Sequence, residues 1–117
     1  MLLSEVSSVL KGKILEPGEN GGDTEVYTAC GCDLMSDVLA FVKDQTLLLT
    51  GLINSQVIRT AEMMDIVAVC FVRGKTPPEE VLSLAKAKNI AILTTDYPMY
   101  TACGKLYEKG LGGRKSD

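Results

Sequence analysis

Histidine and tryptophan are both absent from this chain of 117 residues. The lack of histidine removes the commonest general base and the commonest metal ligand, which excludes many classes of enzyme. The chain also lacks the Gly-x-x-x-x-Gly-Lys-Ser/Thr phosphate loop. We therefore expect a non-catalytic protein that needs no cofactor.

Basic residues are scarce, since 12 Lys and Arg face 15 Asp and Glu, for a net charge of -3. Binding of nucleic acid requires clustered basic side chains, and the only such cluster is Arg114-Lys115 near the end of the chain. No apolar run approaches the roughly 20 residues of a membrane span, and the first residues do not resemble a signal peptide. We expect a cytoplasmic protein that binds neither nucleic acid nor membrane.

The four cysteines, in a chain without a secretion signal, are expected to be reduced thiols. Cys30 and Cys32 precede a predicted helix, where a thiolate has a lowered pKa and two thiolates can hold a soft metal ion. This pattern gives an alternative function, a thiol-based metal or redox protein. The competing interpretation is ordinary packed thiols, because structural zinc takes about four ligands and Cys70 lies within an apolar strand.

Apolar runs of strand length alternate along the chain with amphipathic helical patterns. Such alternation predicts a parallel sheet with crossover helices. We expect strands at residues 13–15, 24–30, 46–50, 66–72 and 90–93, and helices at 4–10, 33–44, 55–64, 77–88 and 98–109. The strand at 66–72 is the most apolar and is placed at the centre of the sheet.

The length fits a single α/β domain, with a mostly parallel sheet of about five strands and helices on both faces. We assign this domain to residues 1–111. Residues 112–117 have no apolar side chain with which to anchor, so they are predicted to form a flexible tail.

Four of the strands stop at small, polar or glycine residues, namely at 30–33, 50–51, 73–76 and 94–96. The carboxyl ends of parallel strands share one edge of a sheet, where open α/β sheets bind ligands. This edge is therefore the candidate ligand site. Its candidate residues are Asp33, Ser36, Asp37, Thr50, Gly51, Asn54, Arg73, Gly74, Lys75, Thr94, Thr95 and Asp96.

Each of these groups also has a purely structural interpretation. Asp, Ser and Thr residues cap the first turns of helices, and glycine serves the geometry of turns. Free amides at helix starts also attract phosphate, with Arg73 and Lys75 adding charge. A further alternative is a small phosphotransfer enzyme that uses Asp33, Asp37 or Asp96 with a divalent ion. Tyr97 and Tyr100, which follow the last strand, either stack on a base or pack against a second subunit.

Three segments together resemble a known small domain: residues 32–39, which read Cys-Asp-Leu-Met-Ser-Asp-Val-Leu, the strand 66–72 with Gly74 and Pro77, and residues 90–95. On these segments the chain resembles the DRTGG-domain family, from the first helix to Gly110. Similar domains occur in phosphotransacetylases, in CBS-domain pyrophosphatases and at the N-terminus of HPr kinase. Short members are often labelled serine kinases of HPr, but the similar domain lacks the kinase chemistry.

The resemblance implies a non-catalytic regulatory or ligand-sensing α/β domain that acts as a homodimer. It implies a small-molecule or nucleotide ligand, or docking on a metabolic or redox enzyme such as an iron-only hydrogenase system. Where many members have Thr-Gly-Gly after the central strand, this chain has Val72-Arg73-Gly74. An arginine side chain thus replaces open backbone, and the resemblance transfers no catalytic residue.

Overall fold

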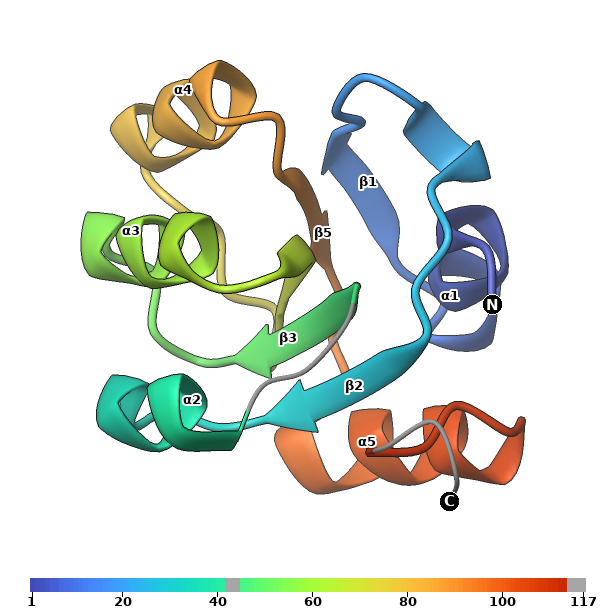
Figure 1. Ribbon diagram of the computed structural model, residues 1–117. Coiled ribbons are helices and arrows are strands. Elements are labelled where there is room, and N and C mark those ends of the chain that lie inside the picture. Colours follow the sequence, from blue (N-terminus) through green and yellow to red (C-terminus); the bar gives the residue numbers. More distant parts are fainter. Residues whose placement is uncertain (42–44, 114–117) are drawn as a thin grey trace.

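The computed structural model describes residues 1–41 and 45–113. The predicted end of the second helix at 43–44 and the part of the predicted tail beyond 113 lie outside these residues. In chain order, the elements are α1 (Leu3–Val9), β1 (Lys13–Glu16), η1 (Gly21–Asp23), β2 (Thr28–Gly31), α2 (Met35–Phe41), β3 (Thr46–Thr50), α3 (Ser55–Met63), β4 (Ile66–Phe71), α4 (Glu79–Ala87), β5 (Ala91–Thr94) and α5 (Met99–Glu108) (Figure 1).

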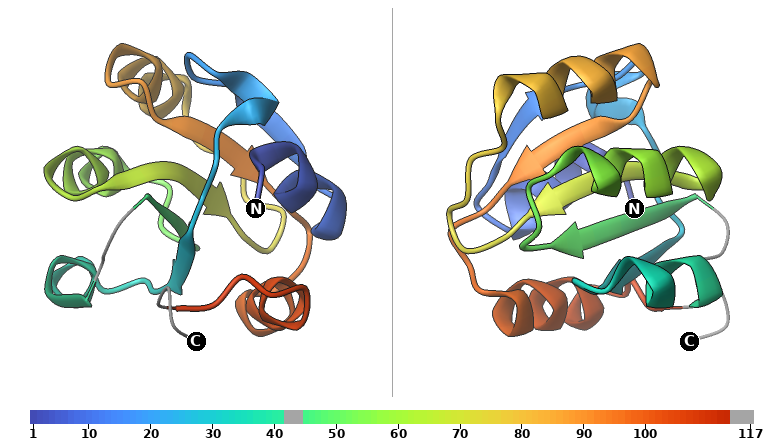
Figure 2. Two further views of the ribbon diagram at one scale, coloured as in Figure 1. Left: turned by 45° about the vertical axis from the view of Figure 1, so that its right-hand side comes forward. Right: turned by 90° about the vertical axis from the view of Figure 1, so that its left-hand side faces the viewer.

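Within the described residues, five strands form one sheet in the order β1-β5-β4-β3-β2. The pairs β2–β3, β3–β4 and β4–β5 are parallel, whereas β1 pairs antiparallel with β5. The arrows of β3, β4 and β5 end on the same side of the molecule in the right-hand view of Figure 2. The mostly parallel sheet is confirmed, with β4 at its centre as predicted.

Helices cover both faces of the sheet, with α2, α3 and α4 on one face and α1 and α5 on the other (Figures 1 and 2). The strands β2 to β5 follow one another across the sheet, so each right-handed crossover leaves its helix on the same face. The helix α5 comes after the last strand and lies on the opposite face.

Each face of the sheet has its own apolar core. The core beneath α1 and α5 contains Leu3, Val6, Leu10, Leu47, Leu49, Ala68, Cys70, Val72, Leu93, Ala102 and Leu106. The core beneath α2, α3 and α4 contains Met35, Val38, Leu48, Val57, Ile58, Val69, Phe71, Val81, Ala85 and Ile92. Side chains of β3 alternate between the two cores, which explains why this strand is apolar throughout.

Three element boundaries differ from the prediction by two residues or more, and one of them is the start of the second helix, which lies at Met35 and not at Asp33. The predicted strand 24–30 begins at Thr28, because Val26 pairs through both backbone groups with Met1, at 2.9 Å each. The helix predicted from Pro77 begins at Glu79. A residue that precedes proline is disfavoured in the helical region, so Pro77 stays outside the helix and Pro78 becomes its N-cap.

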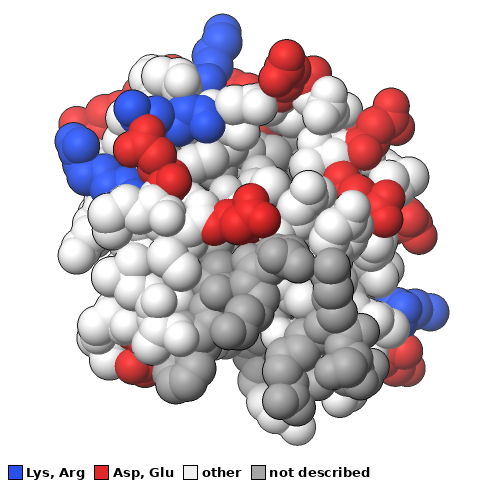
Figure 3. Space-filling view, in the orientation of Figure 1, with Lys and Arg blue, Asp and Glu red and all other residues white. Residues whose placement is uncertain are grey.

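Charged side chains lie on the surface of the domain. On the face shown in Figure 3, Lys and Arg gather over α3 and α4, where Lys88 Nζ lies 2.7 Å from Glu62 Oε2. Both side chains are substantially exposed, so this ion pair contributes at most about 1 kcal/mol. No helix in the described part of the chain is both long and apolar enough to cross a membrane.

The helix α5 approaches the sheet closely at Gly31, in the edge strand β2. A Cβ atom at this position would lie 2.5 Å from Cys103 Sγ and 3.1 Å from Met99 Sδ. Glycine is therefore required by the space that α5 leaves, since both sulfur atoms belong to this helix.

We predict that Gly31→Ala destabilises the domain by about 1–3 kcal/mol, the usual cost of overpacking a tight contact. Free energies of unfolding from urea titrations measure this loss. Adding Cys103→Ala to Gly31→Ala should restore part of it, because the nearest obstructing atom is then gone.

The matched control is Gly104→Ala, also on α5, where a Cβ would meet nothing within 4 Å. This variant should gain about 0.5–1 kcal/mol from helix propensity. Equal effects of the two glycine substitutions would contradict a close contact at Gly31.

Candidate functional site

The ends of β2, β3, β4 and β5 meet at one edge of the sheet, because these four strands are parallel neighbours. All the predicted site residues therefore lie at or just beyond this edge. They do not form a single cluster, however. Hydrogen bonds join them in two groups, one around Asp33 and one between the loops that follow β4 and β5.

The Asp33 group links the end of β2 to the end of β3. Its Oδ1 atom accepts hydrogen bonds from Thr50 Oγ1 at 2.9 Å and from the Gly51 amide at 2.7 Å. The helix α2 begins only at Met35. The interpretation of Asp33 as a cap of its own helix is thus wrong, because its carboxylate caps the turn after the neighbouring strand.

These contacts favour the ionised form of Asp33. The hydrogen bond from the Gly51 amide contributes most to lowering the pKa of this carboxyl below its usual range. Burial is the second-largest effect and opposes this change, whereas the bond from Thr50 and the charges of Arg73 and Lys75 lower the pKa further. Asp33 therefore stays charged at neutral pH.

Arg73 places its guanidinium group beside this carboxylate. A Cβ at Gly51 would lie 2.7 Å from Arg73 Nη2 and 3.6 Å from Asp33 Oδ1, so the guanidinium rests against the bare backbone of Gly51. Among the residues that the structure describes, no hydrogen bond or ion pair engages this guanidinium. Its donors are available to a ligand.

The second group of hydrogen bonds links the loop after β4 to the loop after β5. The Arg73 amide donates to the Tyr97 carbonyl at 2.9 Å, and the Gly74 amide donates to the Thr95 carbonyl at 2.8 Å. Thr94 Oγ1 donates to the Lys75 carbonyl at 3.1 Å. Thr95 is buried and donates to the Leu10 carbonyl at 2.7 Å. The hydroxyls of both threonines thus donate hydrogen bonds to backbone carbonyls of neighbouring segments.

Four predicted residues lie apart from the Asp33 group and are exposed: Ser36, Asp37, Asn54 and Asp96. Ser36 and Asp37 stand in the first turn of α2. Asn54 is the N-cap of α3, but its side chain makes no capping hydrogen bond. Asp96 lies close to Gly74, where an added Cβ would be 3.0 Å from Asp96 Oδ1.

A hollow of about 460 Å³ opens beside the Asp33 group, lined by Gly31, Cys32, Asp33, Val72, Arg73, Pro98, Met99 and Tyr100. Two of these residues, Asp33 and Arg73, were on the predicted list of ligand-binding residues. The wall formed by the first residues of α5 was missed as a ligand contact. The nearest signal was the pair of tyrosines after the last strand, for which stacking on a base was one interpretation.

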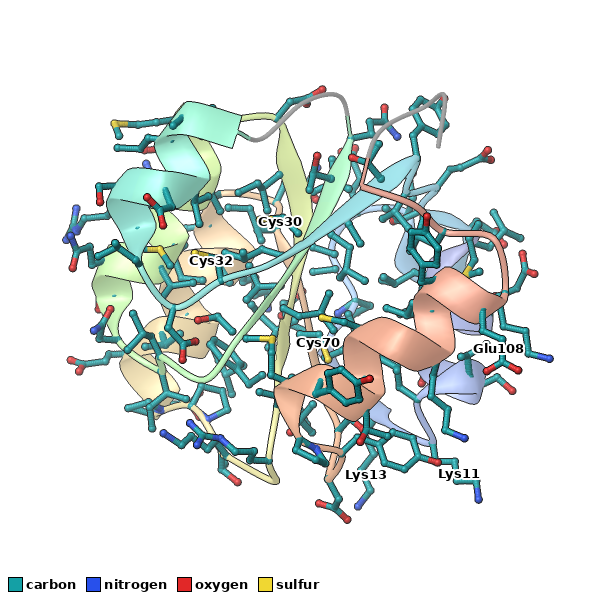
Figure 4. All side chains as sticks on the ribbon, turned by 90° about the horizontal axis from the view of Figure 1, so that it is seen from below. Lys11, Lys13, Cys30, Cys32, Cys70 and Glu108 are labelled. Carbon is teal, nitrogen blue, oxygen red and sulfur yellow. The ribbon has the colours of Figure 1, made fainter. Side chains whose placement is uncertain are left out.

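Burial, not the helix terminus, dominates the chemistry of the thiols. It raises the pKa of Cys30, and the neighbouring Cys32, Cys103 and Asp37 raise it further, opposite to the direction that the sequence suggested. Burial also raises the pKa of Cys70 to about 12. Figure 4 shows Cys30 and Cys32 at β2 and the loop that follows it, and Cys70 on the sheet. In the described ranges, no three Cys, Asp or Glu side chains are grouped to hold a metal ion.

The fold is that of an α/β domain with a mostly parallel sheet. A solved structure shares the fold: the CBS and DRTGG domains of the regulatory region of Clostridium perfringens pyrophosphatase, complexed with the activator diadenosine tetraphosphate. The TM-score is 0.70 at 17% sequence identity, over 90% of this chain and 45% of that one. The chain thus spans less than half of the matched structure. The DRTGG-like fold predicted from the sequence is confirmed.

No protein-family model and no curated protein matches the chain.

We predict that removal of the Asp33 carboxylate weakens the domain and changes its response to acid. Asp33→Ala should cost about 1 kcal/mol, since two hydrogen bonds to an exposed group are lost. Because the folded pKa is lower than the unfolded value, the ionic contribution of Asp33 is complete above the unfolded pKa of about 3.9. It disappears as the pH falls through the folded pKa.

The matched variant is Asp33→Asn, which keeps an acceptor oxygen but carries no charge. Urea unfolding at a series of acidic pH values should show a shallower loss of stability below about pH 4 in this variant than in the wild type. Identical pH profiles would show that the Asp33 charge makes no contribution to folding.

Proposed function

We propose that this chain is a non-catalytic regulatory domain that senses a small ligand in the hollow at the carboxyl ends of the strands. The observation that carries this proposal is that Arg73 lines a hollow at the edge where open α/β sheets bind ligands, while its guanidinium is engaged by none of the described residues. The fold shared with the regulatory region of a pyrophosphatase supports a regulatory role.

The state of the candidate catalytic groups supports binding without turnover. Asp33 has a lowered pKa and holds the turn at Thr50 and Gly51, so it is poorly suited to transfer a proton. The thiols of Cys30, Cys70 and Cys103 have raised pKa values and remain protonated at neutral pH, which makes them weak nucleophiles.

We predict that a nucleotide raises the melting temperature of the domain. Nucleoside mono-, di- and triphosphates, diadenosine tetraphosphate and divalent ions form the screening set. A ligand at one hundred times its Kd stabilises a protein by about 2.7 kcal/mol, which corresponds to a shift on the order of 10 °C for a domain of this size.

The compound that shifts the melting temperature is then incubated with the domain and recovered. Its full recovery is expected for a sensor, and its chemical conversion would contradict a non-catalytic role. If no compound shifts the melting temperature, the ligand-sensing function is refuted.

The exposed face of α5 supports a homodimer. Tyr100 and Tyr107 stand on this face with 91% and 64% of their surfaces exposed, and Gly104 between them leaves open space. Together with Cys103 they border a shallow apolar hollow of about 610 Å³. Exposed aromatic side chains around a depression are typical of protein interfaces, so we assign the contact between two copies to the part of this face around Gly104 and Tyr107, which leaves the ring of Tyr100 accessible.

A cytoplasmic location agrees with the four free cysteines of the domain. An enzyme partner, such as an iron-only hydrogenase system, is proposed from the family resemblance alone.

We predict that Tyr107→Glu converts the dimer into a monomer, since a charge would be buried in the interface. Light scattering coupled to size-exclusion chromatography measures the mass, and circular dichroism checks that the variant is folded. Leu34→Glu, which places the same charge on an exposed side chain next to α2, should remain dimeric. A monomeric wild type would contradict the homodimer.

A further inference from the structure

We propose that the hollow binds a nucleoside monophosphate, with Arg73 as its phosphate-binding residue. This inference rests on the ligand-sensing function and names the ligand class and the contacts. It is argued from the position of the Arg73 backbone, from the place of its guanidinium and from the side chains that surround it.

The backbone of Arg73 is held in an uncommon conformation. Its φ is 60°, in the left-handed region, which is unfavourable for a residue with a Cβ. The amides of Arg73 and Gly74 compensate by bonding to the carbonyls of Tyr97 and Thr95. The start of the side chain is therefore fixed at the edge of the sheet, between the loop after β4 and the loop that leads to α5.

The end of the Arg73 side chain is placed by Gly51. The Nη2 atom would lie 2.7 Å and the Cζ atom 3.6 Å from a Cβ at Gly51, so this position of the guanidinium exists only because residue 51 has no side chain. Arg73 is one of the residues that line the hollow, and its guanidinium makes no hydrogen bond or ion pair with any residue of the described chain. A planar guanidinium with free donors matches the geometry of a phosphate group.

The surrounding charges favour an anion at this point. The Asp33 carboxylate next to Arg73 already accepts hydrogen bonds from Thr50 and Gly51, so its charge is partly satisfied by neutral donors. Lys75 is the second cation close enough to affect Asp33. Asp96, on the other side of Gly74, is exposed to water, which screens its charge.

The rest of the hollow fits a nucleoside. Asp33 Oδ2 accepts no hydrogen bond from the described residues and is available to ribose hydroxyls. Apolar atoms of Val72, Pro98 and Met99 form the walls, and the exposed ring of Tyr100 offers a surface on which a base stacks. The volume of about 460 Å³ lies within the usual range for small-molecule sites, roughly 300–1,000 Å³.

The test is a titration of the full chain with adenosine 5′-monophosphate, followed by calorimetry and by NMR of backbone amides. Ribose 5-phosphate, adenosine and inorganic phosphate are titrated separately. We expect the monophosphate to bind most tightly and to shift the amide signals of Gly51, Arg73 and Tyr100. Added salt should weaken binding of the phosphate compounds and leave that of adenosine unchanged.

Two variants address Arg73 in different ways. Arg73→Ala removes the guanidinium, and Gly51→Ala displaces it by adding a Cβ where Nη2 now lies. Because the obstructing atom in Gly51→Ala is the end of a flexible side chain, this variant should keep its fold. We expect the first variant to lose roughly tenfold or more in affinity for the monophosphate and the second a similar factor. Arg59→Ala, on the exposed surface of α3, is the control and should bind as the wild type does.

The outcomes separate the two proposals. Undiminished binding by both folded variants, or equal affinity for adenosine and the monophosphate, would overturn the role of Arg73. Tight binding of ribose 5-phosphate or inorganic phosphate alone would overturn the nucleoside and leave the phosphate contact. Failure of every phosphate compound, with a melting shift from some other compound, would overturn this inference and leave the ligand-sensing function intact.

Discussion

The passage of α5 over Gly31 is the contact on which the rest of the structure depends. Because β2 to β5 follow one another across the sheet, their crossover helices all fall on one face. The opposite face would be covered only by α1 if α5 did not return across it. This return brings Cys103 against the edge strand, at a distance that only glycine permits. It also inserts Ala102 and Leu106 into the core that α5 shares with α1.

The same passage decides where a ligand site is available. In an open α/β sheet the usual crevice lies where the loops of two neighbouring strands leave toward opposite faces. Here those loops follow β4 and β5, and hydrogen bonds from Arg73, Gly74 and Thr94 close the space between them. The hollow lies instead between the loop after β2 and the start of α5. Its position is thus a consequence of the route of α5.

The features that could be predicted from the sequence are those encoded by local patterns. The apolar runs and glycine stops predicted a mostly parallel sheet with strand 66–72 at its centre, and the edge at which Asp33, Thr50 and Arg73 lie, but they did not predict the order of the strands. The face covered by α5 follows from no such pattern, because the handedness rule applies to a helix between two parallel strands, and no strand follows α5 in the part of the chain that the structure describes. For the same reason Met99 was not predicted as part of a site, whereas Tyr100 was considered as a residue that stacks on a base or packs against a second subunit.

The hydrogen-bond partners of Asp33 also could not be predicted from the sequence. They determine the electrostatics of this edge of the sheet. A carboxylate that precedes a helix is most simply explained as the N-cap of that helix. Here, however, the register between β2 and β3 brings Asp33 beside Gly51. The anion is therefore held by neutral donors, while Arg73 lies next to it unpaired. Had the two formed a tight ion pair, a ligand would first have to break it.

A ligand in the hollow would contact elements from both layers of the domain, namely the loop before α2, the end of β4 and the start of α5. Such a ligand would stabilise the present arrangement of these elements relative to any other. The size of this stabilisation equals the difference in binding free energy between the two arrangements. The exposed face of α5 begins at Tyr100, which lines the hollow. Occupancy of the hollow and contacts made by α5 would therefore be linked through one residue, and linkage of this kind is reciprocal. Under the proposed function, this linkage is the physical basis on which ligand binding would change the contacts of the domain.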